Sequence, residues 1–241
     1  MRVVVVLICL IALTGCGAPT PTGQPAPNPE TNRSSMAKRA AATPSGAQMA
    51  QFRQVVSRVE PVAERYCRRV NPQSNCDFKV VVDKRKGLPP NAYQTLDRSG
   101  QPILAFTQSM LADVRNPDEL AFVLSHEAAH HIRNHIPRSQ QNAMAGAILL
   151  GGLASIAGGN AAAIEAATNA GASVGARSYS KNFELEADAT GTVIAKRAGY
   201  DPVRGAAYFS RIPDPGDVFL GSHPPNAERI ETVRRTAAQM M

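Results

Sequence analysis

The sequence of 241 residues has no tryptophan, and its aromatic residues amount to only 5%. Proteins that bind single-stranded nucleic acid use aromatic side chains, interleaved with basic residues, on which the bases stack. No such pattern is present, so we expect no nucleic acid among the partners. The formal net charge of +7 instead favours approach to anionic envelope surfaces or to acidic substrates.

The N-terminal region has the pattern of an export signal. Met1 and Arg2 precede an apolar stretch over residues 3–12, which is too short to be a useful membrane span. The ending Leu13-Thr14-Gly15-Cys16 resembles a bacterial lipobox, which implies removal of residues 1–15 and acylation of Cys16. Because Gly17 follows, the resemblance implies an outer-membrane lipoprotein that faces the periplasm. An ordinary signal peptide with an incidental cysteine is the alternative.

Residues 16–47 are rich in proline, threonine, serine and glycine. A segment of this composition cannot bury a core, so we expect a flexible tether. The remaining residues, 48–241, are enough for one catalytic domain with its own core.

Cysteine is also scarce, with four residues in the chain. Cys9 leaves with the signal and Cys16 is modified, so Cys67 and Cys76 remain as an even pair in an oxidising compartment. This predicts a disulfide. A second metal site is the weaker alternative, because the spacing is not that of a Cys-x-x-Cys knuckle.

Histidine occurs only five times, yet four of these residues lie within ten positions: His126, His130, His131 and His135. Residues four apart share one face of a helix, so His126 and His130 can direct ring nitrogens at one ion. Glu127 is placed to take a proton from water on that ion. The pattern predicts zinc-dependent peptide hydrolysis, and an incidental match is the alternative.

The residues around this motif predict that it lies on a helix. Asn116 suits the N-cap, Pro117 the first helical position, and Glu119 can close a capping box. Apolar residues then recur at helical spacing, and Pro137 predicts the end of the helix just after His135.

The third metal ligand must come from elsewhere in the chain. A metzincin would need glycine at 133 and histidine at 136, where this chain has Arg133 and Ile136, so that subclass is excluded. The other common solution uses a glutamate on a later helix. Glu184 and Asp188 share a helix face, whereas Glu186 points away. We therefore expect Glu184 on the metal and Asp188 as hydrogen-bond acceptor of a ligand histidine. An exposed acidic helix turn is the alternative.

Four motifs in this order resemble the HtpX and BepA type of gluzincin zinc metalloendopeptidase, over residues 49–235: His126-Glu127-x-x-His130, Glu184-x-x-x-Asp188, Ala198-Gly199-Tyr200-Asp201-Pro202, and Ser222-His223-Pro224-Pro225 followed by Arg229. The resemblance implies an α+β, mainly α, thermolysin-like fold with a small sheet and one zinc ion held by His126, His130 and Glu184. It also implies that His223 lies near the metal, either as a donor to the oxyanion or as a group that blocks the zinc. Arg229 is expected to steady that segment.

Periodicity predicts a helix over residues 49–66, a strand over 77–83 and another strand over 102–107. Pro102 suits a strand at the edge of the sheet. In gluzincins such an edge pairs with the substrate backbone. Asn91-Ala92-Tyr93 resembles a signature near that edge, so Asn91 and Ala92 are expected to bind substrate; a turn asparagine is equally compatible.

Residues 143–164 carry no charge and contain several glycines. This composition is poor for a membrane span. We expect a soluble helical hairpin that is broken at Gly158-Gly159-Asn160 and covers the cleft; membrane contact is the alternative.

Together these patterns predict a zinc endopeptidase of the bacterial cell envelope that cleaves misfolded or unassembled envelope proteins and is attached to the membrane through Cys16. Two alternatives stay open. One is a latent or non-proteolytic, chaperone-like lipoprotein that binds zinc and unfolded chains. The other is a structural lipoprotein whose histidines store metal. Neither alternative needs Glu127.

Overall fold

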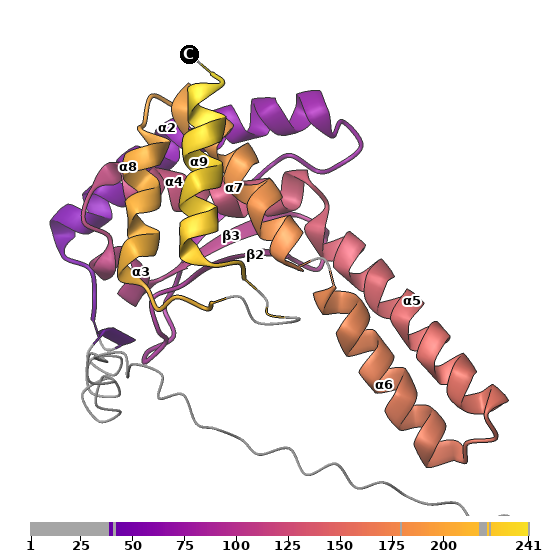
Figure 1. The fold of residues 1–241 in the computed structure, drawn as a ribbon. Coiled ribbons are helices and arrows are strands. Elements are labelled where there is room, and N and C mark those ends of the chain that lie inside the picture. The colour runs from indigo at the N-terminus through magenta and orange to yellow at the C-terminus, as the bar shows by residue number, and fades with distance from the viewer. Residues whose placement is uncertain (1–38, 41, 179, 217–220, 222, 241) are drawn as a thin grey trace, which may run out of the picture.

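The computed structural model describes residues 39–240 apart from residues 41, 179, 217–220 and 222. The predicted signal sequence, Cys16 and most of the tether lie outside the described residues. The rest is mainly helical with one small sheet (Figure 1), which confirms the predicted α+β, mainly α class. The helices are α2 (Gly46–Val70), α3 (Gln108–Asp113), α4 (Pro117–Ile132), α5 (His135–Ile156), α6 (Ala161–Arg177), α7 (Ser180–Arg197), α8 (Pro202–Ala206), the 3-10 helix η1 (Ala207–Arg211) and α9 (Asn226–Ala238); the strands are β1 (Lys79–Asp83), β2 (Ala92–Leu96) and β3 (Pro102–Thr107).

The sheet has the strand order β1-β3-β2, in which β3 runs parallel to β1 and antiparallel to β2. The prediction that residues 102–107 lie at an edge is therefore wrong, because β3 is the central strand. Pro102 is tolerated there because it is the first residue of the strand. All of β3 except Ile103 is buried, whereas no residue of β2 is fully buried. The edge strand that follows Asn91 is β2.

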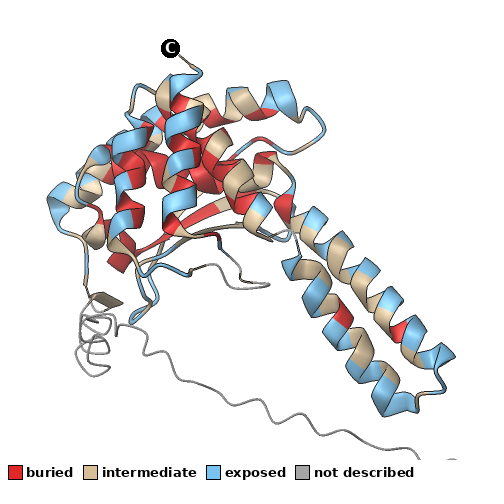
Figure 2. Cartoon of the chain, in the orientation of Figure 1, coloured by how far each residue is buried: buried red, intermediate tan, exposed pale blue. Residues whose placement is uncertain are grey.

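Helix α4 lies at the centre of the fold, with thirteen of its sixteen residues buried. Figure 2 shows it among the other buried segments of the body. Helices α2, α7 and α8 and the sheet all pack against it. A helix enclosed on nearly every side is held in one orientation, so the direction of its side chains is determined by the packing.

The N-terminus of α4 is largely as predicted. Asn116 accepts a hydrogen bond from the backbone N–H of Glu119 at 3.0 Å, and Pro117 is the first helical residue. The predicted capping box does not close, however. The Glu119 carboxylate accepts from the backbone N–H of Arg115 at 2.8 Å and pairs with Arg211. The long-range partner thus draws the Glu119 side chain away from the N-cap.

Helix α4 ends at Ile132, earlier than predicted. The break comes from Asn134, whose φ of 56° lies in the left-handed region that asparagine tolerates. His135 begins α5, and Pro137 lies in the first turn of that helix, where its missing N–H is not needed. The turn at Asn134 places His135 on a different helix from His130.

The C-terminal end of α4 is supported by the loop that the disulfide closes. Cys67 and Cys76 are joined, as predicted. Within this loop, Nδ2 of Asn71 donates to the carbonyl of the last residue of α4 at 3.1 Å. Nε2 of His131 lies 2.7 Å from the carbonyl oxygen of Asn75. The disulfide loop therefore anchors the helix that carries the histidine motif.

Helix α7 passes very close to α4. A Cβ atom on Gly191 would lie 3.0 Å from the backbone nitrogen of His126, so a side chain there would push the two helices apart. This approach brings Glu184 and Asp188, which are both buried, to the face of α4 that carries the histidines.

Helices α5 and α6 form the predicted hairpin, with the break at residues 157–160. Figure 1 shows that the hairpin extends away from the body. Among the described residues of the hairpin, only His135, Ile136 and Ser139 at the start of α5 border the cavity at the histidine motif, so the prediction that the hairpin covers the cleft is wrong. None of the helices formed by the described residues is both long enough and apolar enough to traverse a membrane.

Candidate active site

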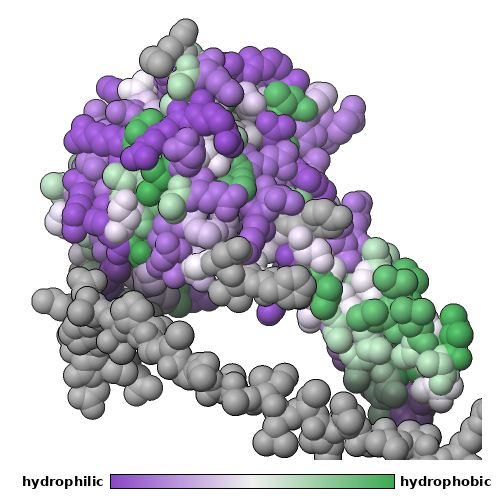
Figure 3. Space-filling view, in the orientation of Figure 1, coloured by the Kyte–Doolittle hydropathy of each residue, from purple (hydrophilic) through white to green (hydrophobic). Residues whose placement is uncertain are grey.

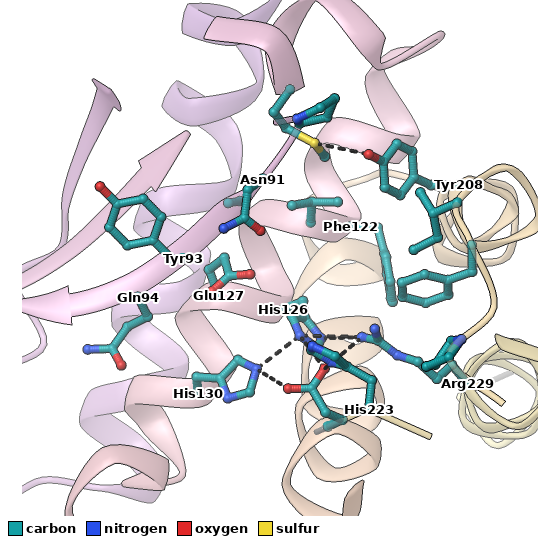
Figure 4. A pocket seen from close by; sticks show the side chains of 18 of the residues that line it. Asn91, Tyr93, Gln94, Phe122, His126, Glu127, His130, Tyr208, His223 and Arg229 are labelled. Carbon is teal, nitrogen blue, oxygen red and sulfur yellow. Dashed lines mark hydrogen bonds and ion pairs between the residues drawn. The ribbon is translucent and has the colours of Figure 1, made fainter. Parts of the chain in front are cut away.

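Three side chains from α4 and α7 converge on one point (Figure 4). The Nε2 atoms of His126 and His130 are 3.0 Å apart, and oxygens of Glu184 lie 3.2 Å from Nε2 of His130 and 3.6 Å from Nε2 of His126. In a tetrahedral zinc site with bonds of about 2.0 to 2.1 Å, ligand atoms are about 3.3 Å apart. The spacing of the three side chains therefore fits a zinc ion.

The second nitrogen of His126 has its own partner. Its Nδ1 lies 2.9 Å from Oδ1 of Asp188. Arg229 donates from Nε and Nη2 to the Asp188 carboxylate, both at 2.7 Å, and its guanidinium lies 3.9 Å from the ring centroid of Phe209. Such a carboxylate orients the imidazole and keeps Nε2 free for a metal. We expected Arg229 to steady the segment around His223; its side chain instead supports Asp188.

The site is built to hold positive charge. Burial by itself lowers the pKa of His126, but hydrogen bonds to Asp188 and Glu184 outweigh burial and raise that pKa to about 10. Burial also opposes ionisation of Glu184, yet contacts with the histidines hold its pKa well below the usual range. The carboxylates of Asp188 and Glu184 therefore favour a positive charge at this point of the site.

His130 is supported from α5 by a contact that sequence reasoning missed. Nδ1 of His135 lies 2.8 Å from Nδ1 of His130, and Nε2 of His135 lies 3.1 Å from Oε2 of Glu186. Glu186 also accepts from Nη1 of Arg138 at 2.7 Å, and the buried His135 ring stacks on Phe183. Glu186 points away from the ligand face, as expected, but it reaches the metal ligands through His135. The only signal in the sequence was the fourth histidine of the cluster.

The remaining predicted residues surround one cavity of about 680 Å³. Glu127, Asn91 and Ala92 line it together with the three ligand side chains. Nδ1 of His223 lies 3.0 Å from Oε2 of Glu184, and its side chain is 52% exposed. The structure thus brings all the predicted catalytic and ligand residues to one place.

The family model described as Peptidase family M48 matches residues 49–237. The chain belongs to peptidase family M48. It resembles the beta-barrel assembly-enhancing proteases of Yersinia pestis, with 31% identity over 148 residues, and of Escherichia coli strain K12, with 30% identity over 139 residues. Each match covers 52% of this chain and 28% of the relative, so the chain matches little more than a quarter of the length of these relatives.

Membership of family M48 confirms the prediction of a metallopeptidase of the HtpX and BepA type. The metal-binding group that the geometry provides for this peptidase consists of His126, His130 and Glu184.

The M48 cavity has an apolar wall that was not predicted from the sequence. Its residues come from three separate segments of the chain: Met110, Phe122, Val123, Tyr208, Phe209 and Ile212. The Tyr208 hydroxyl points at Sδ of Met110, 3.3 Å away. Because these residues are far apart in the chain, no local pattern could have joined them. The wall gives the cavity room for an apolar side chain of a substrate.

The edge strand β2 borders the same cavity through Asn91, Ala92, Tyr93 and Gln94. In the described part of the chain, β2 pairs with β3 only. Thr107 holds the backbone of Asn91. The N–H of Asn91 donates to Oγ1 of Thr107 at 3.0 Å, and the N–H of Thr107 donates to the carbonyl oxygen of Asn91 at 3.0 Å. β2 is therefore an edge strand beside the metallopeptidase site, with one edge not covered by another described strand.

Proposed function

We propose that this chain is a zinc-dependent endopeptidase that cleaves misfolded or unassembled proteins of the bacterial cell envelope. The observation that carries the proposal is the convergence of His126, His130 and Glu184, with ligand atoms 3.0 to 3.6 Å apart, beside Glu127. The names of the relatives, beta-barrel assembly-enhancing proteases, support envelope proteins as the substrate class.

We assign residues 1–15 to a lipoprotein signal, residues 16–47 to a tether lipidated at Cys16, and residues 48–241 to the catalytic domain. The lipobox-like segment supports an anchor in the outer membrane that faces the periplasm. The disulfide between Cys67 and Cys76 supports an oxidising compartment.

Glu127 acts as the general base and acid of the reaction. When bound, zinc supplies a Lewis acid and lowers the pKa of a water molecule to about 7. Glu127 takes the proton of the attacking water and passes it to the leaving amine. Asp188 and Arg229 hold the ring of His126 during this step, since both are buried and hydrogen-bonded to each other.

The substrate lies extended along β2. Strand addition needs a peptide whose backbone N–H and carbonyl groups are free, and a folded protein does not offer such a segment. The preference for misfolded chains follows from this requirement. Asn91 and Ala92 contact the peptide where β2 begins, and the apolar wall accepts one apolar side chain.

The test compares the full-length chain with Glu127→Gln on an unfolded outer-membrane protein and on the same protein after folding. Both chains should hold about one zinc ion, and only the native chain should cleave, with the unfolded substrate preferred. Absence of zinc uptake, or cleavage by Glu127→Gln, would contradict the proposal. If both chains keep the unfolded protein soluble without cleaving it, the chaperone-like alternative is correct. Comparing the envelope proteome of cells that carry either version then identifies the physiological substrates.

A further inference from the structure

The hairpin of α5 and α6 has its smallest residues inside. Beyond His135, the buried residues of these two helices are Gly151 and Gly171. A Cβ atom on Gly146 would lie 2.1 Å from the carbonyl oxygen of Gly171, and a Cβ atom on Gly171 would lie 2.1 Å from the carbonyl oxygen of Gly146. The helices therefore touch backbone to backbone, with no room for a large side chain between them.

The large apolar residues of α5 are on the outside. Nine large hydrophobic residues are exposed in the described part of the chain, and six of them belong to the hairpin. Five lie on α5: Met144 (65% exposed), Ile148 (70%), Leu149 (61%), Leu153 (54%) and Ile156 (86%). At about 100° per residue, these positions cover about half of the circumference of the helix. Figure 3 shows the hydrophobic surface of the hairpin beside a mostly hydrophilic body.

This arrangement is the reverse of what water favours. The hydrophobic effect places large apolar side chains between helices and leaves polar ones outside. Helices surrounded by lipid show the opposite pattern, because small residues let the backbones approach while large apolar residues face the acyl chains. An apolar surface half a helix wide also differs from the narrow stripe that a single partner helix covers.

The two helices of the hairpin differ in their outer faces. The outer face of α6 consists mainly of alanine, serine and asparagine, with one large apolar residue, Val174 (43% exposed), and with Glu165, the one charged residue between positions 139 and 176. Arg177 lies exposed at the end of α6, where the hairpin joins the body. A cationic side chain at this position suits the anionic headgroups next to a buried apolar face.

We propose that the outer face of α5 lies in the surface of a phospholipid membrane, with α5 along the bilayer plane and α6 toward water. An interfacial position fits a helix pair with one apolar and one polar side. It also agrees with the absence, among the described residues, of any helix suited to cross a bilayer. Because the first residues of α5 line the 680 Å³ cavity, this contact brings the cavity close to the membrane surface.

The absence of tryptophan from the chain makes the proposal testable with a single reporter. Ile148→Trp places the reporter on the outer face of α5, and Ala166→Trp places it at an exposed position on α6 as the matched control. Each full-length variant is mixed with vesicles of phosphatidylethanolamine and phosphatidylglycerol, with and without brominated acyl chains. Both variants carry the same N-terminal region, so any difference between them arises in the hairpin.

The expected result is a blue shift of the emission and quenching by the brominated lipid for Ile148→Trp, and neither for Ala166→Trp. Adding Leu153→Asp to the Ile148→Trp chain should abolish the shift, because a buried carboxylate opposes insertion. Emission from Ile148→Trp that vesicles do not change would overturn the proposal. A blue shift without vesicles that grows with protein concentration would also overturn it, because a second copy would then cover the face.

Discussion

The Nδ1 atoms of His130 and His135 lie 2.8 Å apart, so one ring donates a hydrogen bond to the other. His130 can offer Nε2 to a metal only when its proton is on Nδ1, which makes His130 the donor and His135 the acceptor. The proton of His135 is then on Nε2, 3.1 Å from the Glu186 carboxylate. Burial and the neighbouring His130 lower the pKa of His135 to about 4, which keeps this ring neutral. The pair therefore sets the tautomer of a metal ligand.

Replacing His135 should weaken zinc binding without removing a ligand. His135→Phe keeps an aromatic ring against Phe183 but leaves the Nδ1 proton of His130 without an acceptor. Loss of such a partner weakens metal affinity by about 10- to 100-fold. Competition with a chelator measures the affinity, and His131→Phe is the control, because His131 contacts the carbonyl of Asn75 outside the site. Equal affinities in the two variants would show that His135 does not orient His130.

The two glutamates of α7 should differ in their effect on zinc. Glu184→Gln removes a charged ligand and should nearly abolish binding. Glu186 points away from the ligand face, but its contact with His135 predicts a small loss of zinc affinity in Glu186→Gln, since the glutamine amide can still accept that hydrogen bond. Zinc titration of both variants shows which of them loses more zinc affinity. A larger loss in Glu186→Gln would show that Glu184 is not the third ligand.

Zinc binding should become tighter as the pH rises toward 10. Although burial lowers the pKa of His126, its hydrogen bonds to Asp188 and Glu184 raise it to about 10, so zinc must displace a proton at neutral pH. Release of one proton changes the affinity about tenfold per pH unit. Because the pKa of His126 is raised in the folded chain, its protonated form also increases the free energy of unfolding when no zinc is bound. This contribution is complete below about pH 6.5 and is lost as the pH rises through 10. Titrations in buffers one pH unit apart test the first effect, and a pH-independent affinity would refute it.

His223→Ala separates the two roles of this residue. If His223 donates to the developing oxyanion, kcat should fall by roughly a hundredfold with little change in KM. If it blocks the fourth metal position at rest, activity toward unfolded substrates should rise. Zinc content is measured in parallel, because His223 also contacts Glu184 at 3.0 Å. A variant that equals the native chain in rate and metal content would place His223 outside the mechanism.

Removal of the disulfide should destabilise the fold and loosen the end of α4. The double variant Cys67→Ser, Cys76→Ser loses the closure of a loop of about ten residues, which contributes about 2 to 3 kcal/mol. Urea unfolding of both proteins, with and without a reductant, measures the difference. The native chain should lose stability in reductant and the double variant should not. If reductant has no effect on either protein, the disulfide does not stabilise the chain.

The sequence alone was sufficient for the features that depend on local spacing. His126 and His130 share a helix face because a helix repeats every 3.6 residues, and Asn116 and Pro117 mark its start for equally local reasons. The same periodicity separates Glu184 from Glu186. The break at residues 157–160 follows from glycine and asparagine in the chain itself.

Only the tertiary structure decided which segments meet. The central position of β3 depends on pairing with β1 and β2, and the apolar wall consists of residues from three separate segments. Arg229 supports Asp188, and His135 supports His130, because α4, α5, α7 and α9 pack in one particular way. The apolar pattern of α5 suits a protein interior and a membrane surface equally well. Only the glycine contacts with α6 show which side of α5 faces outward. Such contacts arise from packing between residues that are distant in the chain, and no local repeat in a single sequence indicates which of them meet.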